Sequence, residues 1–220
     1  MSYKVKIGID ENGNDYFLDF EKTQNILLRG TTGGGKSICL HTIIKRILEQ
    51  DRKAEFILID PKQVEFSRFK GIPNIKVVSS WKAEDVLLVL NELCDKQKEL
   101  QKEVFVIIDE ISDFYFYKHR PLDKPLLQLI ENSTNKKVHL LISSQTAYGP
   151  KKISPKIPDR IGFACSNLAD SLSIIKKGGC EKLKGCGDCL AKIDNKITRV
   201  QIDYICGEIK EFINSLKESD

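Results

Sequence analysis

Short apolar runs alternate with stretches of helical periodicity along most of this 220-residue chain. Continuous apolar runs that predict buried strands lie at residues 26–28, 56–59, 75–78, 104–108, 138–142 and 161–165. Apolar residues at helical spacing predict helices over residues 38–50, 83–101, 121–132 and 168–175. Buried strands separated by helices are typical of a mostly parallel sheet with helices on both faces. The pattern therefore predicts an α/β fold.

The two ends of the chain carry the pattern of antiparallel hairpins. Residues 3–10 and 16–20 alternate apolar and polar positions around a Glu-Asn-Gly-Asn turn, which predicts an N-terminal β-hairpin. A second hairpin is predicted over residues 190–202, and helical spacing predicts a final helix over residues 205–216. The sequence contains no internal repeat, no low-complexity tract and no long linker. We therefore expect a single domain.

The run Gly-Thr-Thr-Gly-Gly-Gly-Lys-Ser at residues 30–37 matches the pattern G-x-x-x-x-G-K-[ST] in full, between a predicted strand and a predicted helix. Glycines let backbone N–H groups wrap around a polyphosphate, and the helix N-terminus adds partial positive charge. We expect Lys36 to reach the β- and γ-phosphates of ATP and the Ser37 hydroxyl to ligate Mg²⁺. A glycine-rich turn without a ligand is the alternative, and the complete motif argues against it. Nucleotide binding is assigned to Gly30, Thr31, Thr32, Gly33, Gly34, Gly35, Lys36 and Ser37.

An acidic pair follows the buried run at residues 104–108. Open α/β sheets bind ligands at the carboxyl ends of their strands, which is where Asp109 and Glu110 stand. We expect Asp109 to hold Mg²⁺ and Glu110 to act as the general base on the attacking water. Solvated acids at a strand end are the alternative.

Gln145 follows the run at 138–142 and is expected to sense the γ-phosphate, with a solvated strand end as its alternative.

Six motifs follow one another over nearly the whole chain. They are Gly30-Thr31-Thr32-Gly33-x-Gly35-Lys36-Ser37; Asp60-Pro61-Lys62 with Glu65 and Gly71-Ile72-Pro73; Asp109-Glu110-x-x-Asp113; His139-Leu140 with Gln145; Ile157-Pro158-x-Arg160-Ile161-x-Phe163; and Gly178-Gly179-x-Glu181-Lys182-Leu183-x-Gly185-x-Gly187-Asp188. Together they resemble the FtsK/SpoIIIE-type DNA translocases of the HerA/FtsK superfamily of P-loop ATPases. The resemblance implies a RecA-like P-loop NTPase fold for one motor domain over residues 1–220.

The resemblance also implies an activity and partners. Members of this family form homo-oligomeric rings, here expected to be hexameric, around double-stranded DNA, hydrolyse ATP at subunit interfaces and move the duplex through the pore. Arg160 stands in the family's Ile-Pro-x-Arg motif and is the candidate arginine finger for the neighbouring subunit, with a surface arginine as the alternative. The same residues would serve a viral genome-packaging ATPase, and the same fold occurs in protein-secretion or assembly ATPases.

Positive charge is concentrated in one stretch of the chain. The formal net charge is +4 overall but +6 over residues 118–160, which hold nine basic and three acidic residues. Such segregation is typical of binding to a phosphate backbone. In RecA-like rings the loops after the strands at 104–108 and 138–142 face the pore, so these loops are expected to contact the duplex backbone. Solvated surface lysines are the alternative. The assigned DNA-binding residues are Lys118, Arg120, Lys124, Lys151, Lys152 and Lys156.

Cysteines gather near the C-terminal hairpin. Cys186 and Cys189 form a C-x-x-C pair, and Cys180 and Cys206 lie close to it in the sequence. Four thiolates could hold zinc, and two could form a redox pair. The second C-x-x-C pair of a zinc ribbon is missing, and residues three apart on a strand point to opposite faces. We interpret these cysteines as free thiols and leave metal binding open.

The chain shows no sign of a membrane or secretory segment. No apolar run reaches the roughly 18 residues that cross a bilayer, and the N-terminal residues carry no signal-peptide pattern. We therefore expect a cytoplasmic protein with no membrane segment in this chain. Its short length suits a minimal motor encoded by a mobile element or a phage.

Overall fold

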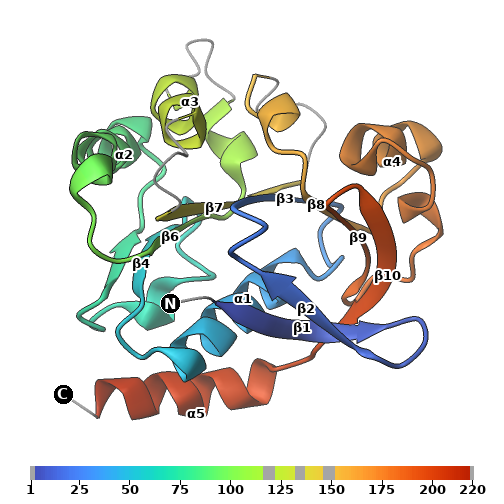
Figure 1. Ribbon diagram of the computed structural model, residues 1–220, viewed down its shortest axis with the longest axis horizontal. Helices are drawn as coiled ribbons and strands as arrows, with labels where there is room; N and C mark the ends of the chain where they lie inside the picture. Colours follow the sequence, from blue (N-terminus) through green and yellow to red (C-terminus); the bar gives the residue numbers. More distant parts are fainter. Residues whose placement is uncertain (1–2, 116–121, 132–136, 146–151, 219–220) are drawn as a thin grey trace.

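The computed structural model describes residues 3–115, 122–131, 137–145 and 152–218. Within these ranges the strands form one ten-stranded sheet in the order β2-β1-β10-β9-β8-β3-β7-β6-β4-β5 (Figure 1). The strands are β1 (Lys4–Asp10), β2 (Asp15–Asp19), β3 (Asn25–Arg29), β4 (Glu55–Ile59), β5 (Ile75–Val78), β6 (Val104–Ile108), β7 (Val138–Ser144), β8 (Arg160–Phe163), β9 (Asp188–Ile193) and β10 (Lys196–Ile202). The α-helices are α1 (Lys36–Gln50), α2 (Ala83–Lys96), α3 (Asp123–Glu131), α4 (Leu168–Ile175) and α5 (Cys206–Lys217). None of these helices is both long enough and apolar enough to span a membrane.

The sheet has a parallel half and an antiparallel half, which meet at β8. Strands β8, β3, β7, β6, β4 and β5 pair in parallel. Strands β9, β10, β1 and β2 continue the sheet through antiparallel pairs. The predicted α/β class, with a mostly parallel sheet and an N-terminal hairpin, is confirmed. The sequence did not predict that the two hairpins lie side by side in this sheet, with Gly8 opposite Ile202.

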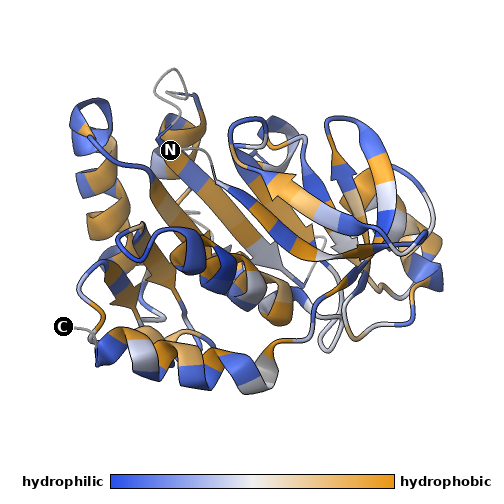
Figure 2. Ribbon diagram, turned by 60° about the horizontal axis from the view of Figure 1, so that its bottom comes forward, coloured by the Kyte–Doolittle hydropathy of each residue, from blue (hydrophilic) through white to orange (hydrophobic). Residues whose placement is uncertain are grey.

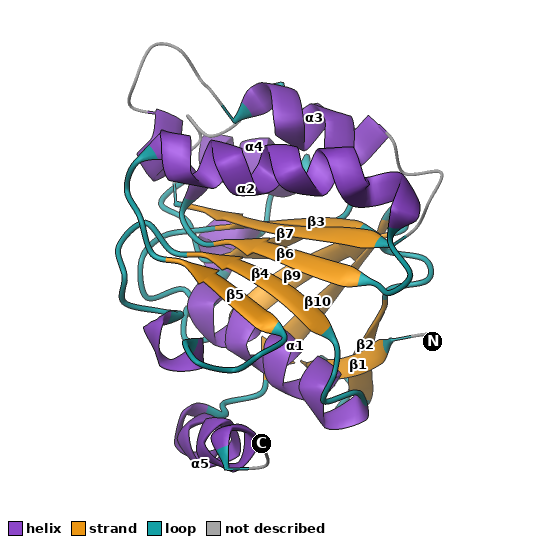
Figure 3. Ribbon diagram, turned by 90° about the vertical axis from the view of Figure 1, so that its left-hand side faces the viewer, coloured by secondary structure: helices purple, strands orange, loops and turns teal. Residues whose placement is uncertain are grey.

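Alternate residues of the central strands enter two cores, one on each face of the sheet. In β6, Phe105 and Ile107 join the core that contains the buried residues of α1 and α5, whereas Val106 and Ile108 join the core that contains those of α2 and α3. Figure 3 shows this layering, with α2, α3 and α4 on one side of the sheet and α1 and α5 on the other. Figure 2 shows hydrophobic residues concentrated along the central strands. Burial on both faces explains why these strands are continuous apolar runs in the sequence.

The observed elements differ from the predicted ones mainly at their ends. Helix α2 ends at Lys96 and continues as a 3₁₀ turn at Gln97–Glu99, whereas the spacing predicted a helix to residue 101. Helix α1 begins at Lys36, two residues earlier than predicted. The lysine and serine of the glycine-rich motif therefore stand in the first turn of a helix, where backbone N–H groups are free to bind an anion.

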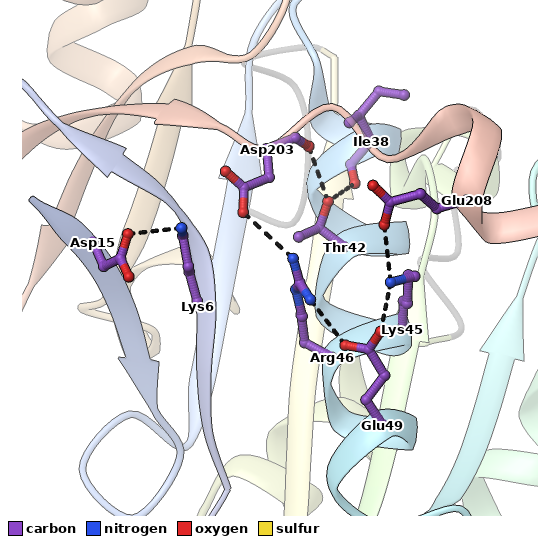
Figure 4. A network of polar contacts seen from close by, with 9 residues as sticks. All are labelled: Lys6, Asp15, Ile38, Thr42, Lys45, Arg46, Glu49, Asp203 and Glu208. Carbon is purple, nitrogen blue, oxygen red and sulfur yellow. Dashed lines mark hydrogen bonds and ion pairs between the residues drawn. The ribbon is translucent and has the colours of Figure 1, made fainter. Parts of the chain in front are cut away.

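Helix α1 is anchored by the C-terminal part of the chain. The Lys45 ammonium lies 2.5 Å from Oε1 of Glu49 in its own helix and 3.1 Å from Oε2 of Glu208 in α5 (Figure 4). The Thr42 hydroxyl contacts the Asp203 carbonyl at 3.3 Å, just before α5. The helix that carries Lys36 is thus held by α5 and the segment just before it.

Candidate nucleotide-binding site

The glycine-rich loop of residues 30–37, the P-loop, has a backbone that only glycine accepts at key points. Gly30 has φ +157°, and a Cβ there would lie 2.6 Å from the Phe163 Cβ of β8. Gly35 has φ +109°, and a Cβ there would lie 2.6 Å from the Gly187 Cα. Real Cβ atoms do not approach other carbons this closely, so these two glycines allow the loop to pack against its neighbours.

Two other segments hold the P-loop in place through its backbone. The Thr31 N–H donates to the Ala164 carbonyl, immediately after β8, at 2.8 Å. The Gly187 N–H donates to the Gly34 carbonyl at 2.9 Å. Residues 185–188, which entered the sequence argument only as a family motif, therefore brace the P-loop. No local pattern predicted this contact, because it joins residues about 150 positions apart in the chain.

The Lys36 ammonium is held inside this loop. Its Nζ donates to the Gly30 carbonyl at 2.8 Å and to the Thr31 carbonyl at 2.9 Å. Burial lowers the pKa of Lys36, and the charges of Glu110 and Asp109 act in the opposite direction. Since an ammonium group has three donors, two carbonyl partners leave one proton for an anionic ligand. Lys36 is therefore close to both acids and suitably placed to bind a phosphate.

The end of β7 orients both acids of the pair after β6. Ser143 Oγ donates to Asp109 Oδ1 at 2.6 Å and accepts from the Glu110 N–H at 2.9 Å. The Gln145 N–H donates to Glu110 Oε1 at 2.9 Å. Sequence reasoning missed the role of Ser143, although a serine at the end of an apolar strand run was a usable signal. Because β7 lies between β3 and β6, its end can contact both the P-loop and the acids.

Gln145 also bonds to the P-loop through its side chain. Thr32 Oγ1 donates to Gln145 Oε1 at 3.0 Å. The structure therefore brings together Lys36, Asp109, Glu110 and Gln145, which the sequence placed on three separate segments. Ser37 is half-buried in the first turn of α1, beside Lys36. The predicted site residues from these segments thus meet at one edge of the sheet.

The oxygen ligands at this edge fit Mg²⁺. A serine hydroxyl and a carboxylate, Ser37 and Asp109, are groups that Mg²⁺ binds together with phosphate oxygens and water. Burial raises the pKa of Asp109 to about 6, and the charges of Glu65, Glu110 and Asp60 add to this effect. Carboxylates that repel one another in a buried site are stabilised by a cation.

Arg160 has contacts that the sequence did not predict. Its side chain is only 4% exposed. The guanidinium donates to the carbonyls of Ser154 at 2.7 Å, Ile157 at 3.3 Å, Ser173 at 3.3 Å and Ile174 at 2.8 Å. An arginine finger must present its guanidinium to a neighbouring subunit, whereas four hydrogen bonds direct this one to carbonyls of its own chain. In this structure Arg160 ties the segment before β8 to the C-terminal turn of α4. These contacts argue against the arginine-finger role, which stays a prediction.

The predicted DNA-binding residues divide into two groups. Lys118, Arg120 and Lys151 lie outside the described residues. Lys124, Lys152 and Lys156 are exposed, and the Lys156 ammonium lies 3.1 Å from Glu131 Oε1. Their contact with a duplex stays a prediction.

The cysteines near the C-terminal hairpin point into different surroundings. Cys180 and Cys189 are fully buried, whereas Cys186 is exposed, and the side chain of Cys206 is not described. Burial raises the pKa of Cys180 to about 11. Among the described residues no three metal-ligating side chains are grouped so that they could hold an ion. In this structure Cys180 and Cys189 are core residues.

Comparisons with known proteins agree with this site. The family model FtsK/SpoIIIE family matches residues 1–111, just over half of the chain. "DNA translocase FtsK" of Caldanaerobacter subterraneus subsp. tengcongensis is 30% identical over 98% of this chain and 35% of that protein. The protein of the same name from Staphylococcus epidermidis is 28% identical over 98% of this chain and 32% of its own length. The chain thus spans about a third of the curated relatives it matches.

Solved structures share the fold at lower sequence identity. The conjugation coupling protein TcpA of pCW3 superposes with a TM-score of 0.80 at 19% identity, over 98% of this chain and 70% of TcpA. The type VII secretion ATPase EccC of Thermomonospora curvata has a TM-score of 0.81 at 17% identity, over 97% of this chain and 31% of EccC. The DNA-packaging ATPase B204 of Sulfolobus Turreted Icosahedral Virus has a TM-score of 0.65 at 18% identity, over 82% of this chain and 98% of B204. With its assembled P-loop and acidic pair, this chain belongs to the FtsK/SpoIIIE family and is a P-loop ATPase domain.

Proposed function

We propose that this chain is the motor domain of an ATP-driven translocase of double-stranded DNA. The observation that carries the proposal is the meeting of Lys36, Asp109, Glu110 and Gln145 at one sheet edge in a chain of the FtsK/SpoIIIE family. The curated relatives reported above are named DNA translocases, and each matches nearly the whole of this chain. These relatives are about three times as long as the region that matches this chain. The proposal of a DNA substrate therefore uses only the matching region.

The proposed chemistry follows from the contacts at the site. The P-loop N–H groups and Lys36 bind the β- and γ-phosphates. Ser37 and Asp109 would hold Mg²⁺, which neutralises phosphate charge when bound. Glu110 takes the proton of the attacking water, and the Gln145 N–H fixes the orientation of its carboxylate. Thr32, bonded to the Gln145 side chain, couples the P-loop to the same strand end.

The proposed assembly is a hexameric ring in the cytoplasm that hydrolyses ATP at its subunit interfaces. The excess of basic residues between 118 and 160 supports a pore that contacts phosphates without reading bases. Lys124 and Lys152 are exposed on this stretch. The Arg160 guanidinium is bonded within its own chain, so the residue that would complete the site from a neighbouring subunit is left unassigned.

A motor for viral genome packaging or for protein secretion is the second candidate. It is favoured by the fold, which is shared with B204 and EccC. A packaging motor also acts on duplex DNA, whereas a secretion motor acts on protein. The response to DNA therefore separates the secretion ATPase from the two DNA motors.

The test is ATP turnover by the purified chain without DNA, with linear duplex DNA and with single-stranded DNA. We expect stimulation by the duplex that weakens between about 50 and 200 mM salt, because phosphate contacts release counterions. Lys36→Ala is the control that removes turnover under every condition. Electron microscopy with duplex and a non-hydrolysable ATP analogue reports the ring. Equal turnover with and without DNA by assembled rings would contradict a DNA motor and favour the secretion ATPase.

A further inference from the structure

The loop after β4 places a second carboxylate beside Asp109. Asp60 follows β4 as Asp109 follows β6, and the two strands are parallel neighbours with Ile59 opposite Ile108. The Asp109 N–H donates to the Ile59 carbonyl at 2.9 Å. Ile59 and Ile108 both enter the core shared with α2 and α3. Because successive side chains of a strand point to opposite faces, Asp60 and Asp109 both turn toward the face of α1.

Asp60 has one oxygen that the described part of the chain does not use. Its side chain is fully buried. Oδ2 accepts from the Phe66 N–H at 2.9 Å, which fixes the loop after β4. Oδ1 is buried and has no hydrogen-bond partner among the described residues. An unpaired buried carboxylate oxygen is costly, so this position favours a donor that is not part of the chain.

Glu65 extends the same group of acids from the other end of that loop. Nε2 of His41, one helical turn after Ser37 on α1, lies 3.1 Å from the Glu65 carbonyl and 4.0 Å from Glu65 Oε2. A carbonyl only accepts, so this nitrogen carries the proton. Glu65 directly precedes Phe66, whose N–H is bonded to Asp60 Oδ2. Glu65 therefore lies between Asp60 and the first turns of α1, which carry Ser37.

Two lysines near these acids are engaged elsewhere. Lys36 donates to two P-loop carbonyls. The Lys62 ammonium lies 3.6 Å from Oδ2 of Asp113, three residues after Glu110. Neither contact reaches the Asp60 oxygen. The described residues also contain no group of three His, Cys, Asp or Glu side chains that could hold an ion, so we expect Asp60 to reach the ion through water.

We propose that Asp60 and Glu65 are positioning residues of the Mg²⁺ site, and that they accept hydrogen bonds from water molecules bound to the ion that Ser37 and Asp109 hold. Mg²⁺ gives up its waters reluctantly and keeps several of them in protein sites. Removing an outer hydrogen-bond partner of a metal site typically lowers metal affinity by about 10- to 100-fold. The inference rests on nucleotide binding by the P-loop, one part of the proposed function, and is independent of DNA.

The test uses Mn²⁺ as the probe and measures its binding by electron paramagnetic resonance with ATPγS present. Asp60→Asn keeps an oxygen for the Phe66 N–H and replaces the unpaired oxygen with a donor. We expect it to lower Mn²⁺ affinity by about tenfold or more, while the affinity for a fluorescent ATP analogue in EDTA stays unchanged. Asp123→Asn is the matched control, because Asp123 is also buried, with one oxygen bonded to the Tyr115 hydroxyl and the other unpaired, but it lies on α3. Asp123→Asn should bind Mn²⁺ like the wild type.

Glu65→Gln tests the second residue in the same assay. We expect a loss of Mn²⁺ affinity that adds to that of Asp60→Asn, with metal-free nucleotide affinity retained. Glu103→Gln is its control, since Glu103 Oε2 lies 3.0 Å from Nε2 of another buried histidine, His139. Wild-type Mn²⁺ affinity in the Asp60→Asn variant would overturn this inference and leave the P-loop assignment intact. Failure of the wild type to bind nucleotide in EDTA and in Mn²⁺ would overturn the P-loop assignment and this inference together.

Discussion

The two halves of the sheet contribute to the nucleotide site in different ways. The parallel half supplies the groups expected to contact phosphate and metal, since Lys36, Asp109 and Gln145 all follow parallel strands. Among the described residues the antiparallel half supplies no such group, but the turn before β9 holds the Gly34 carbonyl of the P-loop through the Gly187 N–H. The residues expected to bind phosphate and metal thus lie in one half of the sheet, and the turn that braces the P-loop lies in the other. Changes in the parallel half should abolish function, and changes in the antiparallel half should weaken it.

The largest effect is expected from Lys36→Ala in the parallel half. The variant loses the ammonium that binds the β- and γ-phosphates, so ATP turnover should fall to background and affinity for a fluorescent ATP analogue should drop sharply. Folding should persist, because the substitution also removes a buried charge. Circular dichroism checks the fold. Turnover at the wild-type rate would remove the P-loop assignment.

Glu110→Gln should separate binding from hydrolysis. Glutamine keeps an oxygen that can accept the Gln145 N–H, but it cannot take a proton from water. We expect turnover to fall by about 10²- to 10⁴-fold while ATP binding is retained. Single-turnover hydrolysis of radiolabelled ATP, compared with equilibrium binding, measures both quantities. Hydrolysis close to the wild-type rate would assign the general base to another residue.

The sequence predicted the site best where the contacts are local. The P-loop and the Asp109–Glu110 pair are contiguous in the chain, and each follows a recognisable strand. Ser143 was missed as an orienting residue because its two hydrogen bonds cross from β7 to the residues after β6. The contacts of Arg160 were not predicted, because only the folded chain brings the carbonyls of Ser154 and α4 around its guanidinium. The same limit applies to the two hairpins, whose strands were predicted but whose pairing was not.

Gly187→Ala tests the support from the antiparallel half. Gly187 has φ +93°, and a Cβ there would lie 2.9 Å from Gln201 Nε2 and 3.3 Å from the Ile202 Cβ. Relief of this strain displaces the N–H that holds the Gly34 carbonyl. The loss of a hydrogen bond worth about 1 kcal/mol corresponds to about fivefold weaker nucleotide binding, which fluorescence titration measures.

Gly13→Ala is the control for Gly187→Ala. Gly13 also has a left-handed backbone, with φ +82°, in the turn between β1 and β2, but a Cβ there meets nothing within 4 Å. It should lower stability by about 1 kcal/mol through backbone strain and leave nucleotide affinity unchanged. Equal losses of affinity in the two variants would mean that the turn at 185–187 gives the P-loop no specific support.

The smallest effect is expected from Asp188→Asn, at the first residue of β9. The Asp188 carboxylate accepts from Arg199 Nε at 2.9 Å and NH2 at 2.7 Å, and from the Lys184 N–H at 2.9 Å. These contacts, led by the Arg199 hydrogen bonds, lower the pKa of Asp188 below its ordinary value of 3.8. Because the folded-state pKa is lower than the unfolded one, the stabilisation is present above about pH 4 and is lost as the pH falls through the folded-state value. The substitution should therefore lower the free energy of unfolding by about 1 kcal/mol at pH 7, and not more, because the Arg199 side chain is 42% exposed.

Urea unfolding of the wild type and of Asp188→Asn at pH 7 and pH 3 measures this difference, which should shrink at the lower pH. A difference that is the same at both pH values would show that the ion pair does not stabilise the turn that braces the P-loop.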